Sequence, residues 1–295
     1  MIWFLFAILS GFFIALSDAL NKKYFSSEGF PSMLTARLLG SFPFLFPIFL
    51  YLTFFKKPFS YLTLDLAFTT LILLFLEIIA NILYMKGIQV SPLSLSLPFL
   101  SFTPIFIIFT GYLILGEKIS LLGSIGIAFI VMGSYTINLP IIREGFTAPI
   151  KAIFREKGSF LLLQVALIYS LTAVLGKKGL LLTDPLWFAS FLFSLLGIVG
   201  SLMVKFLYPI NLFKLIKDNF KAFLAVGLTH ALMCIFQMIA LSGIETAYMI
   251  ALKRTSILFA VILGYFFFKE KHFWIRILAS SLMFVGIIFI TLAKS

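Results

Sequence analysis

Long apolar runs separated by short polar segments make up most of the chain, and their lengths predict membrane-spanning helices. A helix needs about 20 apolar residues to cross about 30 Å of hydrocarbon. Ten runs of this kind follow one another, at residues 2–23, 32–55, 62–86, 92–115, 119–139, 159–178, 185–207, 220–243, 246–268 and 272–293. The pattern predicts an all-α integral membrane protein with ten transmembrane helices.

The second half of the chain repeats the first at a spacing of 153 residues. Matching leucines and phenylalanines carry little weight in a chain that is 62% hydrophobic, so the inference depends on glycine and charged positions. Gly111-Tyr112 recurs as Gly264-Tyr265, Glu117-Lys118 as Glu270-Lys271, and Gly133 as Gly286. Internal repeats of this kind are typical of transporters.

Five apolar runs fall in each half, and this odd number determines the expected symmetry. Because the chain crosses the bilayer an odd number of times before the repeat begins, the second half enters from the opposite side. We therefore expect a 5+5 inverted structural repeat, with a pseudo-two-fold axis in the membrane plane. The first repeat is expected at residues 1–139, a polar linker at 140–158 and the second repeat at 159–295.

Composition excludes several classes of protein. A mean hydropathy of +1.14 with 12% charged residues does not fit a water-soluble globule. The net charge is +12, but the basic residues stand mostly at the ends of apolar runs, which indicates contact with the lipid bilayer and not with nucleic acid. Cys234 is the one cysteine, and no His or Cys spacing suits a metal, so we expect neither disulfide, metal nor cofactor.

Two shorter segments carry local signals. Three prolines fall in the run 92–115 and remove backbone donors, which predicts a helix that is interrupted and able to bend: Pro92, Pro98 and Pro104. Lysines and apolar residues alternate at helical spacing over 209–221. That segment is expected to be either a short helix at the headgroups or a solvated loop.

Short motifs recur at fixed places in the repeat. Gly-Tyr-x-x-x-Gly-Glu-Lys at 111–118 and Gly-Tyr-x-x-x-Lys-Glu-Lys at 264–271 end the fourth run of each half. Arg37 stands near the start of the second run, and Val90-Ser91-Pro92 leads into the fourth. In order and spacing, these motifs resemble the EamA branch of the drug/metabolite transporter superfamily over nearly the whole chain.

The resemblance implies an integral membrane carrier whose central cavity is lined by helices 1 to 4 and 6 to 9. It does not identify a substrate, because members carry chemically diverse solutes. We expect a monomer or a homodimer. The resemblance and the positive-inside rule disagree on orientation, since Lys and Arg are more frequent on the side opposite the chain ends. Both ends of the chain are expected on one side.

Ionisable side chains inside apolar runs indicate function, because each costs about 2.5–3.5 kcal/mol at the centre of a membrane helix. Glu77, Asn81 and Tyr84 are spaced to share one face of the third run. A spacing of 153 residues leads from them to a second polar set, namely His230, Cys234 and Gln237. The two sets are expected to face each other across the cavity.

Glu77 and His230 can each be interpreted in two ways. They bind solute and exchange protons, or they form a buried pair that holds the halves together. Asp18 is a further candidate for proton coupling, although its spacing from Lys22 favours an ion pair within the same helix.

Lys253 and Arg254 are adjacent cations in an otherwise apolar run. Arginine suits bidentate capture of phosphate or carboxylate, and lysine suits a point contact. The pair also resembles one in the phosphate-translocator branch of the superfamily, although residues near Leu100 lack the further lysine of that branch. The alternative is an internal ion pair with Glu77, Asp18 or Glu245.

The sequence therefore predicts a secondary transporter of a small polar metabolite, anionic or zwitterionic, across the inner (plasma) membrane. It acts by alternating access, either coupled to protons or by exchange. No catalytic set is present, so an enzyme is not expected; the alternative is a non-transporting scaffold or lipid-handling protein. The candidate binding residues are Lys253, Arg254, Glu77, His230, Asn81, Gln237 and Tyr84, and the proton-coupling candidates are Glu77, His230 and Asp18.

Overall fold

The computed structural model describes residues 2–56, 61, 63–91, 93–136, 157–268 and 273–294, and the regular structure within these ranges is helical. Six helices are long and apolar enough to cross a membrane: α1 (Ile2–Phe25), α2 (Phe30–Lys56), α3 (Leu64–Val90), α8 (Lys157–Leu181), α9 (Pro185–Leu207) and α11 (Phe220–Gly243). Their agreement with the predicted runs follows from the length and apolar character of those runs.

Shorter helices occupy most of the remaining chain. They are η1 (Ser26–Glu28), α4 (Leu93–Ser96), η3 (Leu97–Phe102), α5 (Thr103–Leu115), α6 (Leu121–Thr136), α10 (Leu212–Asp218), α12 (Thr246–Lys253), α13 (Ser256–Phe268) and α14 (Phe273–Lys294). The all-α membrane fold is thus confirmed, whereas ten spans remain a prediction. Of the predicted linker, residues 140–156 lie outside the described residues, and α8 already begins at Lys157.

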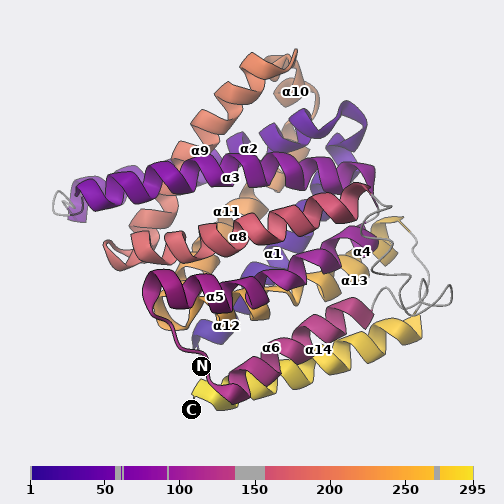
Figure 1. Ribbon diagram of the computed structural model, residues 1–295. Helices are drawn as coiled ribbons and strands as arrows, with labels where there is room; N and C mark the ends of the chain where they lie inside the picture. Colours follow the sequence, from indigo (N-terminus) through magenta and orange to yellow (C-terminus); the bar gives the residue numbers. More distant parts are fainter. Residues whose placement is uncertain are drawn as a thin grey trace.

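Helices of the two halves pack against each other in matching pairs. The contacts of α1 with α11 have their counterpart in those of α8 with α3, while α2 packs on α9 and α6 on α14. Figure 1 shows α6 and α14 side by side along one edge of the molecule, with both ends of the chain at the same end of the bundle. Long-range contacts therefore follow the sequence repeat.

Glycines permit the closest helix crossings. A Cβ atom at Gly227 of α11 would lie 1.9 Å from the carbonyl oxygen of Gly40 in α2. A Cβ atom at Gly286 of α14 would lie 2.6 Å from the carbonyl oxygen of Gly126 in α6. Small residues at helix crossings let backbones approach and gain van der Waals contact, which is one source of association between helices in lipid.

Two of the predicted runs form interrupted helices, the run 92–115 as its prolines predict and the run 246–268 in contrast to the single helix expected there. The run 92–115 contains the 3₁₀ segment η3 between α4 and α5, and Pro104 lies in the first turn of α5. The run 246–268 is broken at Arg254 and Thr255, between α12 and α13. By the repeat spacing of 153 residues, these two residues are equivalent to Ser101 and Phe102 of η3. The interruptions therefore fall at the same position in the two halves.

The segment 209–221 contains the predicted short helix. Asn211 caps α10, because its side-chain oxygen accepts a hydrogen bond of 3.0 Å from the backbone N–H of Lys214. Phe213 is 77% exposed while Leu215 is buried against the bundle. The structure thus contains the predicted short helix and not an irregular loop over residues 212–218.

Candidate functional site: a polar cavity between the halves

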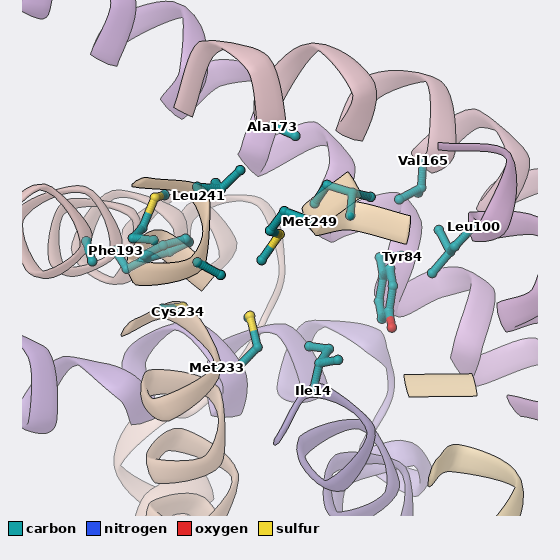
Figure 2. Close-up of a cluster of buried hydrophobic side chains, with 14 of the residues drawn as sticks. Ile14, Tyr84, Leu100, Val165, Ala173, Phe193, Met233, Cys234, Leu241 and Met249 are labelled. Atoms are coloured by element: carbon teal, nitrogen blue, oxygen red, sulfur yellow. The ribbon is translucent and has the colours of Figure 1, made fainter. Parts of the chain in front are cut away.

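Nine helical elements surround a central cavity with about 70 Å³ of free volume. All eight predicted site residues line it: Asp18, Glu77, Asn81, Tyr84, His230, Gln237, Lys253 and Arg254. Apolar side chains complete the wall, and Figure 2 shows Ile14 of α1 and Met233 of α11 among them. The structure thus brings the candidates together, while their binding roles remain a prediction.

The cavity is small for a metabolite. A cavity of about 150 Å³ can hold benzene, and one water molecule takes up about 30 Å³ of liquid. The free volume of about 70 Å³ therefore fits waters, not an organic solute with several heavy atoms. Any such solute requires the surrounding helices to separate.

Asp18 forms a buried network with Arg37 and Tyr84. Arg37 Nη2 donates to Asp18 Oδ1 at 2.7 Å, and the Tyr84 hydroxyl group donates to Asp18 Oδ2. The guanidinium group of Arg37 also lies 4.7 Å from the centre of the Tyr84 ring. Since these residues belong to α1, α2 and α3, the network fixes three helices of the first half around one compensated carboxylate.

The predicted ion pair between Asp18 and Lys22 is wrong. Lys22 Nζ donates instead to the backbone carbonyl oxygens of Ile88 and Ser91. Asp18 sits deeper in the bundle, where the fixed guanidinium group of Arg37 reaches it from the neighbouring helix.

Glu77 is held by neutral groups. Asn81 Nδ2 lies 3.1 Å from Glu77 Oε2 and 2.9 Å from the Glu77 carbonyl oxygen. Thr172 of α8 lines the same cavity wall. None of the ion pairs among the described residues includes Glu77.

His230 lines the cavity in a largely apolar environment. Its ring nitrogens lie 3.8 and 3.9 Å from Cys234 Sγ, and the Phe193 ring packs edge-on against it with centroids 6.1 Å apart. Within the described chain, no ion pair joins His230 to Glu77. The two side chains therefore contribute separately to the wall.

Lys253 and Arg254 stand where α12 ends, at the helix interruption. Lys253 Nζ donates to Gln237 Oε1 and lies 3.2 Å from Met233 Sδ. Arg254 Nη2 donates to Thr103 Oγ1 at 2.9 Å, and its buried Nε has no hydrogen-bond partner in the part of the chain that the structure describes. No ion pair between described residues includes either cation, so the expected internal carboxylate partners are not bound to them there.

The cavity wall is electrically asymmetric. Repeat equivalents of Lys253 and Arg254 in the first half are Leu100 and Ser101, which are uncharged. After Asp18 is compensated by Arg37, the remaining charges are the carboxyl group of Glu77 from the first half and two cations from the second. The arrangement can bind a carboxylate or phosphate group at one end and a donor group at the other.

Four residues of the site were not among the predicted binding residues: Arg37, Thr103, Tyr169 and Thr172. Arg37 was noted only as part of a motif, although its charge inside the run 32–55 was an available signal. The Thr103, Tyr169 and Thr172 side chains have no charge, so nothing in the sequence distinguishes them from other polar residues of apolar helices.

Long apolar helices in two matching halves around a buried polar cavity define a multi-pass membrane protein with an internal site. A model of the EamA-like transporter family matches residues 1–139 and 156–292. The chain belongs to this family, and the two matches are its two repeats. The members of this family are transporters rather than enzymes.

Similarity to known proteins is otherwise structural. No curated protein matches the chain. A solved structure described only as a crystal structure of a protein superposes with a TM-score of 0.67 at 14% identity, covering 99% of this chain and 96% of that one. At this identity the likeness concerns the fold alone.

Proposed function

We propose that the protein is a secondary transporter of a small anionic or zwitterionic metabolite across the inner (plasma) membrane. One observation carries the proposal: Lys253 and Arg254 line the cavity, and no ion pair among the described residues includes them. Burial of two adjacent cations is costly unless an anion offsets it. The acidic group of a solute supplies that anion when the cavity opens.

The two cations have different parts in this binding. Arg254 is 6% exposed, and its guanidinium plane is fixed at one end by Thr103, so its free Nε can orient an incoming carboxylate or phosphate. Lys253 is held by the neutral oxygen of Gln237, which a negative solute group outcompetes. Binding then replaces weak neutral contacts by charge-assisted ones.

Glu77 provides the second half of the recognition. Asn81 donates to its carboxyl group, and no ion pair among the described residues includes it, so it can accept either the ammonium group of a zwitterion or a coupled proton. Gln237 and Tyr84 add hydrogen-bonding capacity from facing helices, and His230 is the equivalent of Glu77 in the other half. Exchange and proton coupling are both compatible with this wall.

Alternating access follows from the proposed architecture of ten spans in a 5+5 inverted repeat. The matching contacts of α1 with α11 and α3 with α8 support it, as do the equivalent interruptions at η3 and at Arg254. Paired interruptions near the midplane are typical of carriers whose repeats rock around one site. The solute would be released on the other side when the repeats exchange conformations.

Counterflow in proteoliposomes tests the function. Proteoliposomes that contain the purified protein are loaded with an excess of one unlabelled solute, and uptake of the same solute in labelled form is measured. The solutes cover monocarboxylates, dicarboxylates, phosphate esters and α-amino acids. We expect counterflow with at least one anionic or zwitterionic class, and its loss in Arg254→Gln. Lys178→Gln is the matched control, because Lys178 forms an exposed pair with Asp65 outside the cavity.

Failure of all four classes would contradict the proposal and favour the non-transporting scaffold. Counterflow that persists unchanged in Arg254→Gln would leave the carrier function standing but remove the anion-binding role from the cavity cations.

A further inference from the structure

A second charged cluster lies outside the cavity and is not used by the binding mechanism. Glu117 Oε1 pairs with Lys177 Nζ at 2.7 Å, and both side chains are largely buried. The Glu117 carboxylate also accepts hydrogen bonds from the backbone N–H of Thr246 at 3.0 Å and from its hydroxyl group at 3.1 Å. We call Glu117, Lys177 and Thr246 the Glu117 cluster.

The Gly-Tyr-x-x-x-Gly-Glu motif places this carboxylate. Gly116 adopts a left-handed conformation with φ of 68°, which ends α5 and turns the chain back. The N–H of Glu117 then donates to the carbonyl oxygen of Gly111, and a Cβ atom at Gly111 would lie only 3.2 Å from Glu117 Oε2. The two glycines thus have a local role, which is to aim one carboxylate at the start of α12.

The cluster joins the two halves at one end of the bundle. Glu117 belongs to the first half, whereas Lys177 of α8 and Thr246 of α12 belong to the second. Lys177 Nζ also donates to the carbonyl oxygen of Ile244, at 2.7 Å. Since α12 is eight residues long, or about 12 Å at 1.5 Å per residue, the cluster fixes the far end of the helix that ends at Lys253 in the cavity.

An equivalent lysine acts at the opposite end. Lys22 of α1 is related to Lys177 by a spacing of 155 residues, and Ser91 is related to Ile244 by 153. Lys22 Nζ donates to the carbonyl oxygen of Ser91, as Lys177 does to that of Ile244. Both ends of the bundle therefore have a lysine bound to the carbonyl group that precedes the interrupted helix.

We propose that the Glu117 cluster is a gate at the end of the bundle that carries the chain ends, and that Lys22 is part of the corresponding gate at the other end. Both sets of contacts are present together in the structure, so it represents a conformation in which both proposed gates are formed. Opening one side requires the contacts there to separate while those at the other side remain. This inference rests on the proposed carrier function.

Side-resolved cysteine labelling tests the gate without any solute. Cys234 is the one cysteine of the chain, so Cys234→Ala removes the background, and Ala173→Cys places a reporter in the cavity wall. A membrane-impermeant maleimide is applied to right-side-out and inverted vesicles, with the side of the chain ends located by a cleavable terminal tag. The labelling rate from each side measures how often the cavity opens there.

Glu117→Gln should raise labelling from the side of the chain ends about tenfold, as expected for the loss of one charge-assisted hydrogen bond, and leave the other side unchanged. Lys177→Met should act in the same direction, and Lys22→Gln should raise labelling from the opposite side. Asp65→Asn is the matched control, since it breaks the exposed pair with Lys178 at the same end and should change neither rate.

Equal labelling of Glu117→Gln and Asp65→Asn would overturn the gate, and so would an equal increase from both sides. Counterflow by the unsubstituted protein is measured in parallel. Its absence would refute the carrier function, whereas intact counterflow with unchanged labelling would refute the gate alone.

Discussion

Arg254 donates a hydrogen bond of 2.9 Å to the hydroxyl group of Thr103, and this contact joins the interrupted helices of the two halves. Thr103 begins α5, and its repeat equivalent, Ser256, begins α13. Arg254 of the second half is thus held by Thr103, which stands where the interrupted helix of the first half resumes as α5. In the proposed carrier mechanism, relative movement of the halves would change this contact and would thereby link solute binding to the conformational change.

Thr103→Val should test that link. Valine has nearly the same shape but no acceptor, so buried Nη2 of Arg254 loses its partner at a cost of about 1–3 kcal/mol in unfolding free energy. Thermal unfolding in detergent measures the loss. Thr291→Val is the control, because the Thr291 hydroxyl group donates to the carbonyl oxygen of Ile288 within α14 and its removal should have little effect. An equal change in both variants would contradict a specific role for Thr103.

Removal of one member of the Asp18 network should be strongly destabilising. Arg37→Met leaves the buried carboxylate of Asp18 without its cation, and breaking a buried ion pair in this way costs about 3–5 kcal/mol. The double variant with Asp18→Asn should recover part of that loss, because no unpaired charge remains. Additive effects in a thermal-unfolding cycle would show that the two side chains do not interact.

Glu77→Gln should separate proton coupling from binding. Glutamine keeps an oxygen that can accept from Asn81 but cannot titrate, so we expect transport that no longer responds to a pH gradient while solute binding remains measurable. Glu28→Gln, at an exposed position bonded to Asn219, is the control. A pH response equal to that of the unsubstituted protein would assign coupling elsewhere, and His230→Gln would then be examined in the same assay.

The sequence was sufficient for the features that depend on one unbroken helix. Glu77, Asn81 and Tyr84 belong to α3, where a spacing of four and three residues necessarily puts side chains on one face. The repeat then located their counterparts His230 and Gln237 on α11. All five line the cavity because the helical period and the repeat are both regular there.

Features that depend on contacts between helices could not be predicted. Arg37, not Lys22, binds Asp18, because tertiary packing brings α2 closer to that carboxylate than the next turn of α1. The interruption at Arg254 was also missed, since neither proline nor glycine stands there. The only signal for it was the repeat itself. The first half is predicted to be interrupted at its prolines, and a spacing of 153 residues leads from that run to the run 246–268.

In the proposed carrier, the partner of Arg254 is the solute and not a carboxylate of the protein. A double-mutant cycle of Arg254→Gln with Glu77→Gln, reading both melting temperature and the affinity for the solute found by counterflow, measures this directly. We predict a melting temperature close to that of the unsubstituted protein, with affinity weakened about 10- to 150-fold in Arg254→Gln, as one charge-assisted hydrogen bond of about 1.5–3 kcal/mol is lost. Lost stability that Glu77→Gln restores, with affinity unchanged, would contradict the account.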